Sequence, residues 1–290
     1  MKVIPGPASK QLGEKIAELS GLETVPIAFK MFPDGESYIR LEGEVKNETV
    51  AIVQTTSPPQ DTRLVQLILM ADAAKRNGAK EVIAVVPYLA YARQDMVFLQ
   101  GEAVSVETVA RMLKAAGIHS LTTVNVHKEM VLAKFPFPAK MVSAIPLLAE
   151  YFRQKGCGRA FALAPDKGAL WLAQEAKEVL GGECGCLEKR RDRYTGKVSV
   201  AEKKLEVKGK AVIIFDDIIS TGGTIVTAAR ILKEQGAGKV YAACAHPLLI
   251  GDAEERILQA GVKEIVGTDS VPSRVSKVSL APLLSRELTG

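Results

Sequence analysis

Short apolar runs alternate along the whole chain with stretches that have the periodicity of helices. The strand-like runs are Val50–Gln54, Val82–Val86, Leu121–Val124, Ala160–Ala164, Val212–Phe215, Val240–Ala243 and Glu264–Gly267. The helical patterns between them include Thr62–Arg76, Val104–Ala116, Ala169–Leu180 and Ile225–Gln235. This alternation predicts βαβ units and an α/β fold with a mainly parallel sheet that is covered by helices on both faces.

Two segments of the chain are repeated faintly. "KRNGAKEVIAVV" at 75–86 resembles "KEQGAGKVYAAC" at 233–244, and "AGIHSLTTVN" at 116–125 resembles "AGVKEIVGTD" at 260–269. In each copy a helix ends at a glycine, a common C-capping residue, before a buried strand begins. Any two helix–glycine–strand units share this outline, but we favour two related α/β domains. We expect them at 1–140 and 141–290, with the last residues packing back on the first domain.

The composition argues against a nucleic-acid-binding or membrane-spanning protein. The chain has 290 residues with 38 Lys and Arg against 33 Asp and Glu, and this net charge of +5 does not by itself indicate nucleic-acid binding. Aromatic residues make up 5% and form no platform for stacked bases. No run approaches the roughly 20 apolar residues that span a bilayer, and the N-terminus lacks a secretory signal. We expect a cytoplasmic protein that binds neither membrane nor nucleic acid.

The four cysteines, Cys157, Cys184, Cys186 and Cys244, match no zinc-binding spacing. We expect reduced thiols. The alternative, that Cys184 and Cys186 pair or bind a metal, is less favoured.

The segment "VIIFDDIISTGGTI" at 212–225 holds the clearest chemical signal. Asp216 and Asp217 follow a buried strand, and ligands of open α/β sheets bind at that edge. The loop that follows leads to a helix beginning near Ile225, whose free N–H groups bind an anion. The segment therefore predicts ribose 5-phosphate binding, with the 2- and 3-hydroxyls on the two aspartates. The phosphate would lie in the loop formed by Ser220, Thr221, Gly222, Gly223 and Thr224.

This segment also resembles a known motif. "FDDIISTGGT" is similar to the ribose 5-phosphate and phosphoribosyl diphosphate loop of the type I phosphoribosyltransferase fold. Four more segments resemble the ribose-phosphate diphosphokinase family: "MFPDGESYIR" (31–40), "VVPYLAYARQD" (85–95), "LAPDKGAL" (163–170) and "EKRRD" (188–192). The matches run in order from about residue 25 to 270.

The resemblance implies two tandem phosphoribosyltransferase-like domains and an enzyme of nucleotide biosynthesis. That enzyme transfers the β,γ-diphosphate of ATP to the 1-hydroxyl of ribose 5-phosphate, which gives 5-phosphoribosyl 1-diphosphate and AMP. It implies ATP binding by Phe32, Asp34, Glu36, Arg93, Gln94 and Asp95. Phe32 would offer its ring to adenine, and Arg93 would hold a phosphate through its fork of donors.

In the family, the 31–40 segment serves a neighbouring subunit's site. The resemblance therefore implies a homo-oligomer, at least a dimer, that shares its ATP site between subunits. Alone, the segment would be an ordinary Pro-Asp-Gly turn with exposed acids.

The metal candidates, His127 and Asp166, also come from the resemblance. The expected metal is Mg²⁺, with Mn²⁺ possible, and Mg²⁺ prefers oxygen ligands such as Asp166. A lone histidine is more often structural. This chain departs from the family's Asp-x-His motif, because Asn125 replaces the aspartate. Asparagine keeps a side-chain oxygen but has no negative charge.

The irregular segment Gly181–Gly209 predicts either a mobile loop or a β-flap. Within it, Lys189 and Arg191 match the family's catalytic pair, which would stabilise charge on the transferring diphosphate. The alternative is a solvated basic run or a nucleic-acid patch.

Two other functions remain open: a phosphoribosyltransferase, and a non-catalytic regulatory relative. A phosphoribosyltransferase needs one such domain and has no use for the Arg93–Asp95 segment. A regulatory relative would be expected to lose the cations or carboxylates that this chain retains.

Overall fold

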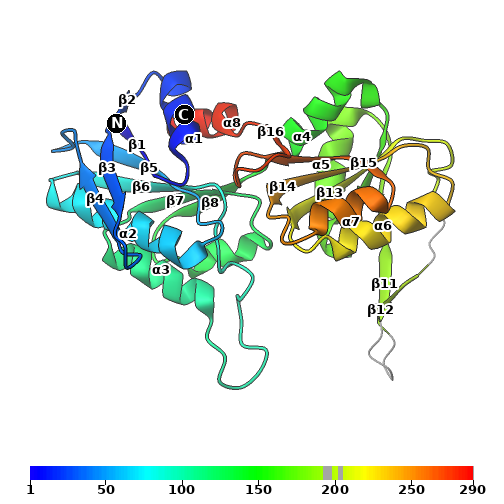
Figure 1. Cartoon of the computed structure of the whole chain (residues 1–290), viewed down its shortest axis with the longest axis horizontal. Coiled ribbons are helices and arrows are strands. Elements are labelled where there is room, and N and C mark those ends of the chain that lie inside the picture. The colour runs from blue at the N-terminus through cyan, green and yellow to red at the C-terminus, as the bar shows by residue number, and fades with distance from the viewer. Residues whose placement is uncertain (192–197, 202–204, 290) are drawn as a thin grey trace. The chain divides into compact units, whose positions relative to one another are not determined.

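The computed structural model describes residues 1–191, 198–201 and 205–289, with side chains over 1–187 and 205–289. The chain divides into two compact units. The first consists of Met1–Ser143 with Ser279–Gly290, and the second of Ala144–Val278. Each unit holds one six-stranded sheet (Figure 1).

The sheet of the first unit is parallel throughout. Its order is β2 (Glu23–Thr24), β1 (Lys2–Pro5), β5 (Thr49–Val53), β6 (Glu81–Val86), β7 (Ser120–Val124) and β8 (Ala139–Val142). One face is covered by α1 (Lys10–Ser20) and α8 (Ala281–Thr289), and the other by α2 (Gln60–Arg76) and α3 (Ser105–Ala115) (Figure 1). Because the inner strands β1, β5, β6 and β7 are mostly buried, both faces of the sheet need this cover.

Three smaller features complete the first unit. An antiparallel hairpin of β3 (Ile27–Met31) and β4 (Ser37–Leu41) packs on α2. A 3-10 helix, η1 (Glu129–Lys134), follows β7. The C-terminal α8 packs on α1, where Ser20 Oγ donates to the carbonyl of Ser285 at 3.5 Å.

The second unit repeats this plan. Its parallel sheet has the order β10 (Cys184–Cys186), β9 (Phe161–Ala164), β13 (Val212–Ile219), β14 (Val240–Pro247), β15 (Val262–Thr268) and β16 (Ser276–Val278). One apolar core lies under α4 (Ile145–Phe152) and α5 (Leu170–Leu180), and the other under α6 (Gly223–Glu234) and α7 (Ala253–Gln259). Between α4 and α5 lie a single π-helical turn, η2 (Arg153–Cys157), and a 3-10 turn, η3 (Lys167–Ala169).

The two sheets share one topology, which confirms the predicted fold class. In each unit three consecutive strands are joined by two helices: β5-α2-β6-α3-β7 in the first and β13-α6-β14-α7-β15 in the second. Gly78 and Gly236 end the equivalent helices α2 and α6 with φ of 82° and 77°, in the left-handed region that suits glycine. The repeated sequence segments are therefore equivalent structural units.

Several local expectations are settled by the described residues. The irregular segment forms an antiparallel ribbon of β11 (Glu188–Arg191) and β12 (Val198–Ala201), so of the two predicted forms the β-flap is correct. All four cysteines are free thiols. No described helix combines the length and the hydropathy needed to cross a bilayer.

Candidate active site

Asp216 and Asp217 lie inside β13, and this corrects the predicted end of the strand. The apolar run stops at Phe215, but the ladder with β14 continues to the pair Ile219–Pro247. A central strand keeps its backbone hydrogen bonds whatever its side chains are, so the carboxylates do not end it. Both aspartates still occupy the carboxyl half of the strand and are half-buried.

The two carboxylates form an electrostatically strained pair. Burial raises the pKa of Asp216 well above its usual value, and the negative charges of Asp217 and Asp166 raise it further. The side chains turn back on the strand, where Asp216 Oδ1 accepts from the Asp217 N–H at 3.0 Å and Asp217 Oδ1 from the Ile218 N–H at 2.8 Å. Hydroxyl donors or a cation placed here would lower this cost.

The Ser-Thr-Gly loop runs directly into α6, which begins two residues earlier than predicted. The helix begins at Gly223, so Gly223 and Thr224 are its first residues, and Gly222 precedes them with φ of 76°. Within the described residues no side chain caps this helix. Its first N–H groups, with the positive end of the helix dipole, therefore form an anion site.

Two contacts hold the loop in place. A Cβ added to Gly222 would lie 2.8 Å from Ile257 Cδ1, and Gly222 has a left-handed φ of 76°, so the approach of α7 and the backbone both favour glycine. Arg256, also on α7, donates to the carbonyl of Thr221 and pairs with Asp252 at 3.0 Å. Sequence reasoning missed Arg256, because 35 residues separate it from the loop and nothing local connects the two.

Asp166 lies at the start of η3, in the same unit. Its Oδ1 accepts from the N–H groups of Gly168 and Ala169 at 3.0 and 3.3 Å. Its charge acts on Asp216, so the "PDKG" loop and β13 form one acidic region. Three predicted elements of the second unit, Asp166, the aspartate pair and the Ser-Thr-Gly loop, thus belong to one end of its sheet.

In the first unit, the segment Arg93–Asp95 follows β6. Asp95 is 4% exposed, and its Oδ2 is 2.9 Å from Lys128 Nζ. That hydrogen bond lowers the pKa of the Asp95 carboxyl. Oδ1 of Asp95 is buried and has no hydrogen-bond partner among the described residues. A buried oxygen of this kind is satisfied in folded proteins by ordered water, an ion or a ligand group.

Arg93 and Gln94 line the surface beside Asp95. Arg93 is exposed, and Gln94 Nε2 donates to Glu102 Oε2 at 3.3 Å. The same oxygen of Glu102 accepts from the N–H groups of Phe98 and Leu99 at 2.7 and 2.9 Å. Glu102 therefore fixes the 94–102 loop, a role that sequence reasoning did not identify.

Phe32, Asp34 and Glu36 lie in the turn of the β3–β4 hairpin and are exposed. Asp34 Oδ1 accepts from the Glu36 N–H at 3.1 Å, and the Phe32 N–H donates to the Glu36 carbonyl at 2.8 Å. Lys30 Nζ lies 4.7 Å above the centre of the Phe32 ring. The turn thus presents an aromatic ring and two acids on an ordered surface.

The metal candidates belong to different units: His127 follows β7 in the first, and Asp166 lies in the second. His127 is exposed, whereas Asn125 is buried and donates through Nδ2 to Ser143 Oγ at 3.3 Å. Among the described residues, no three His, Cys, Asp or Glu side chains form a metal cluster. The side chains of Lys189 and Arg191 lie outside the described residues; their backbones are in β11.

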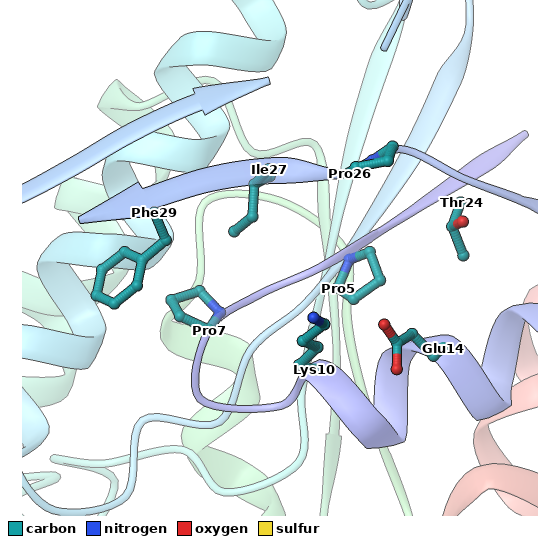
Figure 2. Close-up of a pocket in the computed structure, with 8 residues that line it drawn as sticks. All are labelled: Pro5, Pro7, Lys10, Glu14, Thr24, Pro26, Ile27 and Phe29. Atoms are coloured by element: carbon teal, nitrogen blue, oxygen red, sulfur yellow. The ribbon is translucent and has the colours of Figure 1, made fainter. Parts of the chain in front are cut away.

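One hollow of the first unit, about 450 Å³ in volume, lies apart from these motifs. Figure 2 shows its walls, which come from β1, β3 and the first turns of α1. Its lining residues are Pro5, Pro7, Lys10, Glu14, Thr24, Pro26, Ile27 and Phe29. None of the residues predicted to bind ATP or ribose 5-phosphate is among them.

Comparisons with known proteins agree with these features. Residues 1–117 match the family model described as the N-terminal domain of ribose phosphate pyrophosphokinase, and residues 201–284 match the phosphoribosyl synthetase-associated domain. The ribose-phosphate pyrophosphokinase of Methanopyrus kandleri is 44% identical over 94% of this chain and 93% of its own length. That of Saccharolobus solfataricus is 42% identical over 93% of each chain.

Among solved structures, the phosphoribosylpyrophosphate synthetase of Mycobacterium smegmatis is similar over 99% of this chain and 97% of its own. The TM-score is 0.88 at 28% identity.

Proposed function

The chain belongs to the ribose-phosphate pyrophosphokinase family, and we infer that it transfers the β,γ-diphosphate of ATP to the 1-hydroxyl of ribose 5-phosphate. The products are 5-phosphoribosyl 1-diphosphate and AMP. The observation that carries this function is the pairing of Asp216 and Asp217 with the uncapped start of α6. One end of that site accepts hydroxyl groups, and the other binds an anion.

Ribose 5-phosphate matches both ends. Its 2- and 3-hydroxyls would donate to the carboxylates of Asp216 and Asp217, each bond worth about 1.5–3 kcal/mol. Its phosphate would accept from the N–H groups at the start of α6 and from the hydroxyls of Ser220, Thr221 and Thr224. The contact of Arg256 with the Thr221 carbonyl supports this assignment, because it orders the loop before the ligand binds.

ATP would bind through two surfaces of the first unit. Asp95 supports this assignment with its unpartnered buried oxygen, which the amino group of adenine or a ribose hydroxyl would satisfy. Arg93, exposed beside it, would bind a phosphate, and Gln94 would reach the nucleotide. We assign Phe32, Asp34 and Glu36 to the ATP site of a second subunit, which makes the enzyme a homo-oligomer.

The carboxylate oxygens of this chain are suitable ligands for Mg²⁺. Mg²⁺ keeps several waters and takes one or two carboxylates together with substrate phosphates. Burial and the charges of Asp217 and Asp166 raise the pKa of Asp216, and a bound cation would lower it. We propose Asp166 as a ligand of the ion in the second unit and His127 as a separate metal candidate of the first unit, with Mn²⁺ as a substitute. A bound ion would neutralise phosphate charge.

The catalytic pair is Lys189 and Arg191, which would bring two cations to the diphosphate while it is transferred. The antiparallel ribbon β11–β12 supports this role, because it holds the backbone of both residues in one regular strand. Closing it over the substrates would also exclude water. We propose that the enzyme acts in the cytoplasm.

Phosphorus NMR of the purified chain with ATP, Mg²⁺ and ribose 5-phosphate tests the reaction. We expect AMP together with a 1-diphosphate resonance on the sugar. ADP would show a simple kinase and contradict the function. No turnover with intact ATP binding would show a regulatory relative. The double variant Asp216→Asn/Asp217→Asn is the matched control, because it keeps the shape of the site and removes its charge.

A further inference from the structure

His246 is a buried histidine that the proposed reaction does not use. It lies near the carboxyl end of β14, is 2% exposed, and pairs in the sheet with Ile218 of β13. Its Nδ1 is 2.8 Å from Oγ of Ser270, which follows β15. His246 therefore connects the residues after β15 to β14, the strand next to the one that carries Asp216 and Asp217.

The hydrogen bonds of Ser270 fix which ring nitrogen of His246 carries the proton. The Ser270 hydroxyl donates its hydrogen to the carbonyl of Ala245 at 2.7 Å. Because a hydroxyl has only one hydrogen, Ser270 Oγ accepts in its contact with His246. His246 Nδ1 is therefore the donor, and the neutral ring has its proton on Nδ1 rather than on Nε2. Thr268 donates to the same carbonyl at 2.7 Å, so two hydroxyls anchor the end of β14.

The chain turns sharply directly after His246. The N–H of Leu248 donates back to the His246 carbonyl at 3.1 Å. Leu249 follows with a φ of 43°, a left-handed backbone that is uncommon for a residue other than glycine. A backbone of this kind persists only where the surrounding contacts hold it. The anchored end of β14 holds this turn on one side, and the Ser-Thr-Gly loop holds it on the other.

The segment 248–256 supports the Ser-Thr-Gly loop through three consecutive carbonyls. Those of Ile219 and Ser220 accept at 3.0 Å from the N–H groups of residues 249 and 250, and that of Thr221 accepts from the arginine side chain of α7. In a trans peptide the carbonyl of one residue and the N–H of the next point in opposite directions. The N–H groups of Ser220, Thr221 and Gly222 therefore point away from this segment, and no backbone hydrogen bond among the described residues uses them. Consecutive N–H groups on one side of a turn form an anion-binding concavity.

We propose that His246 is a positioning residue for the phosphate of ribose 5-phosphate. Held by Ser270, its ring fixes the end of β14, and the turn that follows keeps the carbonyls of the Ser-Thr-Gly loop away from the phosphate and its N–H groups toward it. This inference rests on the proposed function and assigns no contact between His246 and the substrate. Loss of the Nδ1–H donor should therefore weaken ribose 5-phosphate binding and leave the transfer step nearly unchanged.

Nitrogen NMR of the full chain labelled with ¹⁵N-histidine tests the tautomer without any substrate. At about pH 8, above the ordinary histidine pKa of about 6.5, we expect the proton of the His246 ring on Nδ1. His119 is the internal control, because its Nδ1 accepts from the Val82 N–H at 3.1 Å and its proton must therefore be on Nε2. His119→Asn and His127→Asn assign the three ring signals. A His246 proton on Nε2 would overturn the proposal.

Substitutions at the two residues test the consequence for binding. Asparagine places a side-chain N–H near the position of Nδ1, whereas glutamine places one near Nε2. His246→Gln and Ser270→Ala should therefore raise the KM for ribose 5-phosphate about tenfold, the effect of one lost hydrogen bond, with kcat nearly unchanged. His246→Asn should stay within about threefold of wild type. Ser273→Ala is the matched control and should change nothing, because Ser273 is exposed and its Oγ contacts Ser276 Oγ at 2.9 Å.

The outcomes separate this role from the proposed reaction. Circular dichroism checks the fold of each variant, and the NMR measurement reports the wild-type His246 ring. A folded Ser270→Ala chain with the wild-type KM, or equal effects of His246→Asn and His246→Gln, would overturn the positioning role and leave the reaction standing. Calorimetric titration with ribose 5-phosphate completes the test. Binding that Ser270→Ala weakens, in a wild-type chain without turnover, would overturn the reaction and support the positioning role, and no binding by wild type would overturn both.

Discussion

Lys128 Nζ lies 2.9 Å from Asp95 Oδ2, across 33 residues of sequence. The pair joins the loop after β6, which carries Arg93, to the loop after β7, which carries His127. Lys128 is partly exposed, whereas the Asp95 side chain is 4% exposed. The ammonium group of Lys128 therefore neutralises the buried carboxylate of Asp95. The pair also fixes the loop after β6, which we assign to ATP binding.

Lys128→Met should leave Asp95 buried and unpaired. Breaking a fully buried pair costs about 3–5 kcal/mol, and we expect a smaller loss of about 2 kcal/mol because Lys128 is partly solvated. Lys210→Met is the matched control, because Lys210 and Glu183 form a 2.8 Å pair in which both side chains are exposed. That change should cost less than about 1 kcal/mol. Urea unfolding measures both losses, and only Lys128→Met should raise the KM for ATP.

Two adjacent glycines of the phosphate loop should respond differently to alanine. Gly222→Ala combines a left-handed backbone, which costs a non-glycine residue about 1–2 kcal/mol, with the clash against Ile257. Gly223→Ala meets open space at the first position of α6 and should leave the free energy of unfolding unchanged or slightly improved. It should nevertheless raise the KM for ribose 5-phosphate, because the methyl group crowds the approaching phosphate. Equal destabilisation by both changes would contradict this account.

Asp216→Asn should stabilise the ligand-free fold and abolish turnover. Because burial and the charges of Asp217 and Asp166 raise the pKa of Asp216 in the folded state, ionisation costs stability. The wild-type fold is therefore free of this cost below the ordinary aspartate pKa of about 4 and bears it increasingly as the pH rises. Without Mg²⁺, the Tm of Asp216→Asn should exceed that of wild type at pH 7 and approach it near pH 4. A lower Tm at pH 7 would show that the carboxylate is stabilising.

The sequence predicts this fold well because its signals are local. Apolar runs and glycine C-caps mark the strands and helix ends, and they place the "FDDIISTGGT" motif at the correct edge. The predicted end of the strand at Phe215 was wrong, because the apolar run stops where Asp216 begins. The hydrogen bonds with β14 continue further, because they depend only on the backbone. Lys128 and Arg256 could not be found in this way, since their partners Asp95 and Thr221 lie 33 and 35 residues away.

Removal of divalent metal should stop the reaction without unfolding the chain. The described residues contain no cluster of three or more metal-binding side chains, so we expect their folding not to depend on a bound ion. Turnover should vanish with excess EDTA and return with Mg²⁺, while the ligand-free Tm stays constant. A large fall of the Tm in EDTA would instead indicate a structural metal.

Glu264 should make the second unit sensitive to acid. Its side chain is 15% exposed, accepts from Lys277 at 2.6 Å and contacts Lys155. Burial alone would raise the pKa of this carboxyl, but the hydrogen bonds and charges of the two lysines outweigh burial and lower it below the usual 4.5. The stability that it contributes is therefore complete above pH 4.5 and is lost as the pH falls through the lower folded-state pKa.

Glu264→Gln tests this account of acid sensitivity. The change should cost about 1 kcal/mol at pH 7, because both lysines are partly exposed, and it should flatten the fall of Tm below pH 4.5. Glu183→Gln, which removes an exposed pair with Lys210, is the control and should leave the Tm profile unchanged. If Glu264→Gln keeps the wild-type slope between pH 3 and 5, the acid sensitivity of the fold arises from other carboxylates.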